Sequence, residues 1–318
     1  MWSSQSKVLP GIAIAFAVFA WGGSFVAARH LLSPSTPGST ALDPVTLAAA
    51  RFAIASLFFA APFGLWVIRR GIAGIDLLRM ALLGQVAFSV YFWLQYTGVR
   101  NTNAGVASVI AVGLFPSATA ALAPLGGERR PSAGAWGALL LGFLGVAAVV
   151  MDKPVEISGS PDFLLGALCL VGNAFAFAAY SLLSRRWMKG LPPLIMTGGS
   201  MIFGTIGLLL MSLASGGSGW KSLAHLDASQ WGALAFLGLA CSVAGYVAWN
   251  FALSRLEAGR AAVWIYAEPV VAAALGWTLL GERFGAFVLL GAGAIALSAI
   301  LANRLRPPAG QNVSLKIR

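Results

Sequence analysis

Charged residues are scarce in this chain. Only 10% of its 318 residues are Asp, Glu, Lys or Arg, whereas 58% are hydrophobic, and the mean hydropathy is +0.83. Soluble domains are typically about 25% charged and about 45–50% apolar. So few charges cannot cover a water-exposed surface, because apolar side chains must then occupy most of it. We therefore expect most of the surface to face a lipid bilayer.

Cysteine and histidine are equally scarce, and each shortage excludes a class of site. Cys169 and Cys241 both fall inside apolar runs, so neither a disulfide framework nor a CxxC redox motif is expected. His30 and His225 form no HExxH motif and no pair with a nucleophile, and no Walker A sequence is present. We expect no metal, no cofactor, no catalytic residue and no hydrolysis of ATP, so the chain is not predicted to be an enzyme.

Long apolar runs, in contrast, fill the chain. Each is about 20 residues long, which is enough for one helix to cross the roughly 30 Å hydrocarbon core of a bilayer. The predicted spans are 9–30, 45–68, 76–98, 102–124, 131–150, 162–185, 193–214, 229–253, 259–280 and 284–304. The sequence therefore predicts an all-α integral membrane protein with ten transmembrane helices.

Basic residues are distributed unevenly between the predicted loops. The net charge of +11 would suggest nucleic acid as a partner of a soluble protein, but here the basic residues lie between apolar runs. With a cytoplasmic N-terminus, fifteen of the 21 Lys and Arg residues face the cytoplasm and five face the other side. This split agrees with the positive-inside rule. We expect both termini to be cytoplasmic, and no nucleic acid to bind.

The two halves of the chain resemble each other. Residues 98–105 (GVRNTNAG) align with 252–259 (ALSRLEAG) at a shift of 154, and the Gly-Glu-Arg sequence at 127–129 recurs at 281–283 with the same shift. The repeated unit thus holds five spans. Because five is odd, the second copy must cross the membrane upside down, as in many secondary transporters. We predict one repeat over 1–152, a second over 153–304, and a polar tail over 305–318.

Short motifs recur in order along both halves. They are Trp21-Gly22-Gly23-Ser24-Phe25, Asp43-Pro44 with Arg51-Phe52, 104–108 (AGVAS), Gly127-Glu128-Arg129, Tyr180 with Ser184-Arg185-Arg186, 259–262 (GRAA), Glu268-Pro269 and Gly281-Glu282-Arg283. Over residues 8–304 the chain resembles the drug/metabolite transporter superfamily of the EamA type. More loosely, it resembles the bacterial aromatic amino-acid exporters within that superfamily. The resemblance implies a basket-like fold of ten helices around a central cavity for a small-molecule substrate, with the fifth and tenth helices at the periphery.

Glu268 is the one carboxylate that the sequence clearly places at membrane depth, near the middle of the ninth span. An unpaired charge there costs several kcal/mol, so such residues usually face a cavity or a partner. Pro269 removes a backbone donor, and Pro116 in the fourth span is its approximate counterpart. Paired helix breaks of this kind indicate a binding site. Two interpretations stay open: a substrate or proton site, or a structural group paired with Arg51 or a polar neighbour.

Arg51 lies about two turns into the second span. We favour a structural or gating role over substrate contact, because a side chain near the end of a span can extend its charge to the membrane surface. An ion pair with Glu268 or with Asp43 is the alternative. The helix breaks and Arg51 together form the predicted gating set: Arg51, Pro116 and Pro269.

Polar and aromatic residues recur together on helical stripes of five spans. Amides inside a membrane helix need partners, so these stripes should face the bundle interior or water. The predicted substrate-binding residues are Trp21, Ser24, Gln85, Phe88, Phe92, Gln95, Asn173, Phe177, Tyr180, Tyr246, Trp249, Asn250, Trp264 and Glu268. Contacts between helices and ordinary packing are the alternative explanation for any one of them.

Such a lining suits an amphipathic metabolite. Aromatic faces bury an apolar body and hold an ammonium group, whereas amides and hydroxyls orient it. We expect a secondary transporter that exports small organic metabolites, aromatic and hydrophobic amino acids first, across a bacterial inner membrane by alternating access, acting as a monomer. The alternatives are a facilitator or proton-coupled exporter of other amphipathic metabolites or drugs, a membrane-embedded enzyme and an assembly component. The enzyme would need paired acids or a His-acid cluster at one membrane face.

Overall fold

The computed structural model describes residues 5–34, 38–126, 132–151, 162–188, 190–217, 219–253, 264–265 and 267–304. Helices make up the regular structure of these residues, and no strand occurs among them, so the all-α prediction is confirmed. The sequence motifs at 127–129 and 259–262 and the tail at 305–318 lie outside the described ranges.

The first half of the chain forms helices at each predicted span. They are α1 (Gln5–Leu32), α2 (Pro44–Arg70), α3 (Gly74–Gly84), the π-helix η1 (Gln85–Val90), α4 (Tyr91–Asn101), α5 (Ala104–Gly113), α6 (Phe115–Ala121), the 3₁₀ turn η2 (Ala123–Gly126) and α7 (Ala133–Met151). The third predicted span is thus one continuous helical run, α3–η1–α4. The fourth is interrupted at Leu114, two residues before Pro116.

The described part of the second half is also helical. Its elements are α8 (Phe163–Trp187), α9 (Pro193–Ala214), the short α10 (Gly219–Leu223), α11 (Ala228–Ala235), the π-helix η3 (Phe236–Ala244), α12 (Gly245–Leu253), α14 (Glu268–Leu280) and α15 (Ala286–Arg304). The eighth span, α11–η3–α12, contains a π-helix just as the third does. The two π-helices lie about one repeat shift apart in the sequence.

Local sequence signals explain where helices begin and end. The Asp43 carboxylate caps α2 by accepting a hydrogen bond from the Thr46 amide at 2.9 Å, and Pro44 follows in the first turn. Asn103 caps α5 in the same way, through the Val106 amide at 2.7 Å. Gly71 ends α2 with a φ of 69°, a conformation that a side chain would strain.

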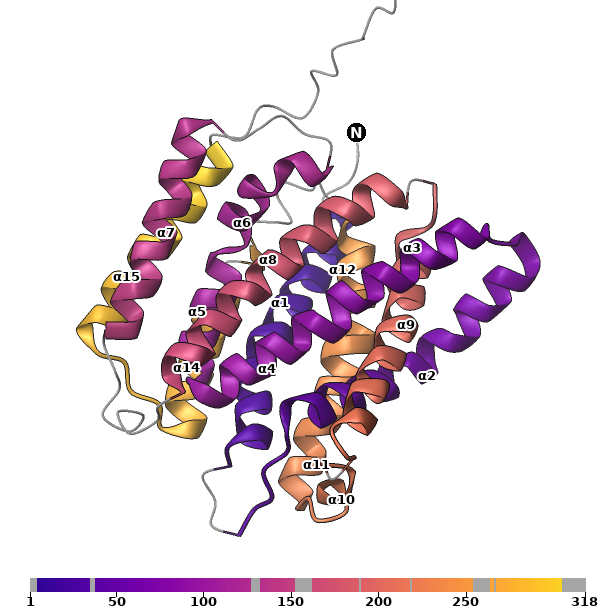
Figure 1. Ribbon diagram of the computed structural model, residues 1–318, viewed down its shortest axis with the longest axis horizontal. Helices are drawn as coiled ribbons and strands as arrows, with labels where there is room; N and C mark the ends of the chain where they lie inside the picture. Colours follow the sequence, from indigo (N-terminus) through magenta and orange to yellow (C-terminus); the bar gives the residue numbers. More distant parts are fainter. Residues whose placement is uncertain are drawn as a thin grey trace, which may run out of the picture.

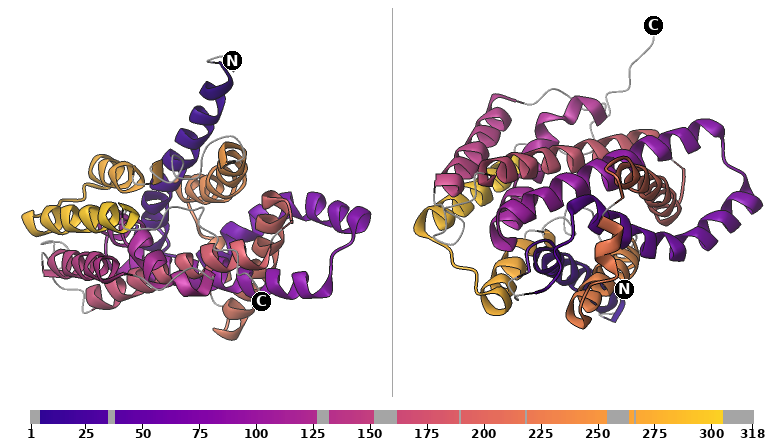
Figure 2. Two further views of the ribbon diagram at one scale, coloured as in Figure 1. Left: turned by 90° about the horizontal axis from the view of Figure 1, so that it is seen from above. Right: turned by 60° about the horizontal axis from the view of Figure 1, so that its bottom comes forward.

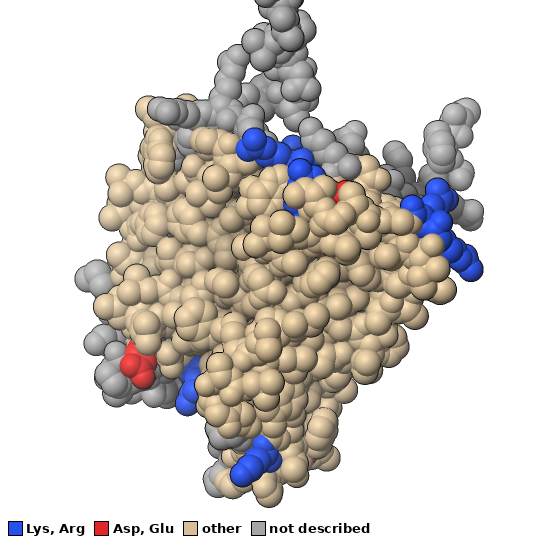
Figure 3. Space-filling view, turned by 45° about the vertical axis from the view of Figure 1, so that its right-hand side comes forward, with Lys and Arg blue, Asp and Glu red and all other residues tan. Residues whose placement is uncertain are grey.

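The described helices include seven stretches that are long and apolar enough to cross a membrane, and three shorter apolar helices at Trp136–Ala148, Glu268–Leu280 and Ala286–Ser298. In the space-filling view, charged side chains gather toward two opposite ends of the visible face, with a broad uncharged band between them (Figure 3). This is the surface of a multi-pass membrane protein. The count of ten spans and the inversion of the second half stay predictions.

The helices are arranged around α1, which contacts α12, α14, η3, α5 and α4 (Figure 1). The hairpin of α2 and α3 extends on one side of the molecule, and the pair α7–α15 forms the opposite edge (Figure 2). Small residues allow that pair to approach closely: a Cβ added at Gly145 would lie 2.8 Å from the Gly291 carbonyl oxygen. The helices that pack around α1 therefore lie between these two edges.

Candidate functional site

Arg51 lies at the centre of the α2–η3 contact, and its side chain is only 2% exposed. Its Nε donates to Ser242 Oγ at 2.7 Å and its Nη1 donates to the Tyr96 hydroxyl at 2.8 Å. The guanidinium carbon lies 5.0 Å from the ring centroid of Phe52 and 4.7 Å from that of Phe92. Hydrogen bonds and cation–π contacts together hold this buried charge.

This geometry corrects two expectations about Arg51. The side chain does not extend to a membrane surface, because its hydrogen-bond partners lie deeper in the bundle and draw it inward. Among the described residues it forms an ion pair with neither Glu268 nor Asp43. Arg51 instead joins the second, third and eighth spans through α2, α4 and η3.

Aromatic rings from four other elements surround this contact. Phe52 packs edge-on against Phe92 with centroids 4.5 Å apart, and against Phe88 at 5.2 Å. Phe88 continues to Tyr246 at 6.0 Å and to Tyr180 at 6.5 Å. We call Trp21, Phe52, Phe88, Tyr91, Phe92, Phe177, Tyr180, Tyr246 and Trp249 the ring cluster.

Trp21 forms the end of the ring cluster on α1. Its ring lies 5.4 Å from that of Tyr246 and 5.3 Å from that of Trp249. Its indole Nε1 donates to the Cys241 carbonyl at 2.9 Å, which fixes the orientation of the ring. Seven of the predicted binding residues, from the first, third, sixth and eighth spans, are thereby brought into one continuous set of ring contacts.

Glu268 lies next to this cluster and is 6% exposed. The sequence placed it near the middle of one helix over 259–280, whereas α14 begins at Glu268, with Pro269 in the first turn. Proline is tolerated there because the first amides of a helix have no partner within it. Gly22 allows the start of α14 to approach α1: a Cβ at Gly22 would lie 2.9 Å from the Glu268 carbonyl oxygen.

The Glu268 carboxylate is unpaired within the described parts of the chain, where it forms neither a hydrogen bond nor an ion pair. It is close enough to the Tyr91 and Tyr246 hydroxyls to interact with them electrostatically. A buried carboxylate without a partner is costly. This position therefore suits a ligand cation or an exchangeable proton.

The remaining predicted binding residues have more ordinary contacts. Gln85 donates to the Phe203 carbonyl at 2.8 Å, Asn250 to the Tyr246 carbonyl at 2.8 Å, and Ser24 to the Trp21 carbonyl at 2.6 Å. These bonds hold helices to one another or lie within a helix. Trp264 is 44% exposed and has no ring partner among the described aromatic residues.

Two predicted amides keep an unused acceptor. Asn173 donates to the Tyr91 carbonyl at 2.9 Å, but its Oδ1 has no hydrogen-bond partner among the residues that the structure describes. Gln95 is 4% exposed, and its Oε1 likewise has none. Buried polar atoms are normally paired, so unused oxygens in the third and sixth spans add acceptor capacity to this region.

The predicted binding and gating sets left out several residues of this site. Tyr96, Ser242 and Phe52 hold Arg51, and Phe115 stacks on Phe177 at 4.2 Å. The sequence signal for the residues around Arg51 is the arginine itself, because a buried guanidinium requires hydrogen-bond acceptors and aromatic faces nearby. The two π-helices were also not predicted. Such segments are frequent at functional sites, and η1 carries Phe88 whereas η3 carries Ser242.

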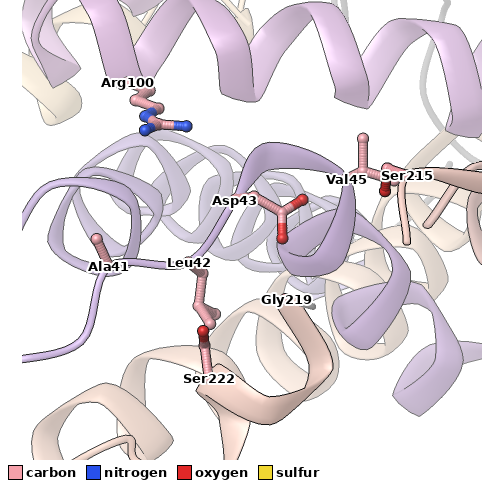
Figure 4. A pocket seen from close by; sticks show the side chains of 8 residues that line it. All are labelled: Ala41, Leu42, Asp43, Val45, Arg100, Ser215, Gly219 and Ser222. Atoms are coloured by element: carbon pink, nitrogen blue, oxygen red, sulfur yellow. The ribbon is translucent and has the colours of Figure 1, made fainter. Parts of the chain in front are cut away.

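A separate cavity of about 430 Å³ opens at one end of the bundle (Figure 4). It is lined by Ala41, Leu42, Asp43, Val45, Arg100, Ser215, Gly219 and Ser222. These residues come from the start of α2, the end of α4, the end of α9 and α10. The cavity therefore lies between segments of both halves.

The described residues contain no group of three or more His, Cys, Asp or Glu side chains that could hold a metal ion. What the arrangement can do is bind an apolar or aromatic body against rings and place a cationic group or proton at Glu268.

Comparisons with known proteins identify the family of this chain. The family model described as "EamA-like transporter family" matches residues 9–151 and again 164–304. An uncharacterized transporter of Archaeoglobus fulgidus is 28% identical over 93% of this chain and 99% of its own length. A probable terminal-alkyne amino-acid exporter of Streptantibioticus cattleyicolor is 27% identical over 91% of each chain.

A solved crystal structure shares the fold, with a TM-score of 0.56, 18% sequence identity, and coverage of 95% of this chain and 98% of the other. The family model covers most of the chain in two consecutive matches. The chain is therefore a multi-pass membrane protein that belongs to the EamA-like transporter family, within the drug/metabolite transporter superfamily.

Proposed function

We propose that this protein is a secondary transporter that exports small amphipathic metabolites, amino acids with aromatic or hydrophobic side chains first, across a bacterial inner membrane by alternating access. The observation that carries the proposal is the position of Glu268. Its buried carboxylate, which has no partner among the described residues, lies beside a cluster of rings contributed by helices from both halves of the chain.

The ring cluster supports a substrate with an apolar body. Tyr246 and Trp249 come from the second half and contact Trp21 from the first, so a ligand among these rings touches both halves. Movement of one half against the other would then change access to that ligand, as in other transporters with internal repeats. The two consecutive family matches and the π-helices in corresponding spans support the inverted-repeat arrangement.

The polar groups near the ring cluster favour a substrate with an ammonium group over one with a phosphate group. Glu268, Gln95 and Asn173 all offer acceptor oxygens, whereas the buried Arg51 already donates to Ser242 and Tyr96. A phosphorylated substrate would need unused buried donors. An amino acid can place its ammonium group near Glu268 and its side chain against the rings. One relative is named as a probable amino-acid exporter, which supports the same class.

The contacts of Arg51 support a role as a gate between the candidate site and one membrane face. It holds α2, α4 and η3 together through two short hydrogen bonds. Opening a path there requires these bonds to break and the Phe52 and Phe92 rings to separate. Pro116 and Pro269, at breaks in the fourth and ninth spans, allow the adjoining helices to bend.

Flux through liposomes containing only the purified protein tests this function. We expect saturable counterflow of phenylalanine and leucine, absent from protein-free liposomes. Trp21→Ala should raise KM about tenfold, because it removes a ring that contacts both Tyr246 and Trp249. Trp277→Ala is the matched control, since Trp277 is 66% exposed on α14 and should leave KM unchanged.

Two results would count against the proposal. Absence of saturable flux for every amino acid would reject the substrate class. An equal effect of the Trp21 and Trp277 substitutions would reject the ring cluster as the place where the substrate binds.

A further inference from the structure

The cavity at the end of the bundle has the size of a ligand site. Its volume of about 430 Å³ lies within the range of about 300–1,000 Å³ that is usual for small-molecule pockets. It is formed where the start of α2 and the end of α4 face the end of α9 and α10. Segments of both halves thus form its wall, as at the candidate site deeper in the bundle.

One cation and one anion line this cavity. Arg100 extends into it from α4, and Asp43 lies below it at the start of α2 (Figure 4). Within the described ranges the Arg100 guanidinium has neither a hydrogen bond nor an ion pair. Arg100 and Asp43 therefore place a hydrogen-bond donor and a hydrogen-bond acceptor at separate points of the cavity wall.

Asp43 keeps acceptor capacity while it caps α2. Its Oδ1 accepts the Thr46 amide at 2.9 Å, and its Oδ2 faces Gly219. A Cβ at Gly219 would overlap that oxygen, so only glycine leaves it room. Ser222, also in the wall, adds a hydroxyl.

The cavity lies directly outward from the Arg51 gate. Arg100 follows Tyr96 by four residues on α4, so the two side chains share one face of that helix. Asp43 precedes Arg51 by eight residues along α2, a rise of about 12 Å. The order along these helices is therefore cavity, gate and ring cluster.

We propose that this cavity is an outer subsite that binds the zwitterionic head group of an α-amino acid on its way between the gate and the aqueous phase. Arg100 receives the carboxylate and Asp43, with Ser222, receives the ammonium group. The proposal rests on the function proposed above, because it takes an amino acid as the substrate.

The test measures KM for phenylalanine separately at each membrane face, by counterflow in right-side-out and inverted membrane vesicles. Arg100→Gln and Asp43→Asn each remove one charge, and asparagine retains the helix cap. Each should raise KM about tenfold or more at the face that carries Arg100, because a charge-assisted contact is lost, and leave KM at the other face within about twofold. Lys221→Gln is the matched control: Lys221 is exposed on α10 at the same end and does not line the cavity.

Ligand analogues provide an independent readout. Phenylalaninamide lacks the carboxylate, so its KM at the Arg100 face should not respond to Arg100→Gln, but should respond to Asp43→Asn. Equal KM values for wild type and both variants at both faces would overturn the subsite while leaving transport intact. Loss of flux in the wild type itself would instead reject the proposed function.

Discussion

Two glutamates flank α14, and they are buried to the same extent but used differently. Glu268 begins the helix and is 6% exposed; Glu282 follows its last residue closely and is 7% exposed. Glu282 accepts the Ala104 amide at 2.7 Å and the Gly105 amide at 3.1 Å. Glu268 has no such partner in the described chain. Burial alone therefore does not distinguish a structural carboxylate from one available to a ligand; hydrogen bonding does.

The contacts of Glu282 explain its structural role. Ala104 and Gly105 form the first turn of α5, where backbone amides have no partner within the helix. A carboxylate is favoured there by both hydrogen bonds and the helix dipole. Gly276 leaves space for it, since a Cβ at Gly276 would lie 2.5 Å from Glu282 Oε2. Because Glu282 is 178 residues from Ala104, this contact connects the two halves of the chain.

Glu282→Ala should give the largest effect in this comparison. It leaves two amides of a buried helix end unsatisfied, and we expect a loss of about 3 kcal/mol in the free energy of unfolding. Thermal unfolding in detergent measures it. Glu282→Gln keeps one acceptor oxygen and should lose about half as much. If Glu282→Ala unfolded at the wild-type temperature, the structural assignment would be wrong.

Glu268→Gln should show the opposite behaviour. The amide is nearly the same size and removes a buried charge that has no partner in the described part of the chain, so thermal stability should be equal or higher. Flux driven by a pH gradient in liposomes should fall about tenfold or lose its response to the gradient, because glutamine cannot exchange a proton. Asp76→Asn, which breaks a surface ion pair with Arg79, controls for loss of a charge elsewhere. Normal pH-driven flux in the Glu268 variant would mean that the protein is a facilitator or couples at another residue.

The sequence alone predicted the helices and the aromatic stripes, but it did not distinguish the roles of these two glutamates. Apolar runs predicted where helices lie, because span length follows from bilayer thickness. The stripes predicted that Trp21, Phe88 and Tyr246 face the bundle interior or water, and in the structure the ring of Tyr246 contacts those of Trp21 and Phe88. The helix break predicted at Pro269 coincides with the first turn of α14, which begins at Glu268, whereas the depth of Glu268 in a membrane stays a prediction.

Partners that are distant in sequence could not be assigned in advance. Tyr96 and Ser242 hold Arg51 from 45 and 191 residues away, and no periodicity encodes that choice. The close approach of α3 and α9 just before η1 is likewise not encoded by a periodic pattern: a Cβ at Gly84 would lie 2.9 Å from the Gly204 amide nitrogen. The cavity at Arg100 and Asp43 likewise depends on how four segments meet.

Asp227 is an exposed counterpart of Glu282, because it also accepts a hydrogen bond from a backbone amide at the start of a helix. Its substitution should change thermal stability least. It caps α11 by accepting the Gln230 amide at 2.9 Å, and Ser229 Oγ donates to it at 2.8 Å. These hydrogen bonds, the Gln230 amide first, lower the pKa of Asp227 to about 2. In the unfolded chain the pKa of an aspartate is about 3.9. The charge of Asp227 therefore stabilises the fold above about pH 4, and this contribution disappears as the pH falls toward about 2.

Asp227→Asn separates that charge from the cap, because asparagine retains the hydrogen bond to the Gln230 amide. We expect a slightly lower Tm than wild type near neutral pH and a difference that shrinks as the pH falls through this window. Thermal unfolding across a pH series measures it. A difference that stayed constant with pH would assign the effect to packing. Asp227→Asn and Glu282→Gln each replace a carboxylate with an amide of nearly the same size. Since the Asp227 carboxylate is in water and that of Glu282 is not, the ratio of these two effects reports how far burial strengthens a carboxylate–amide contact.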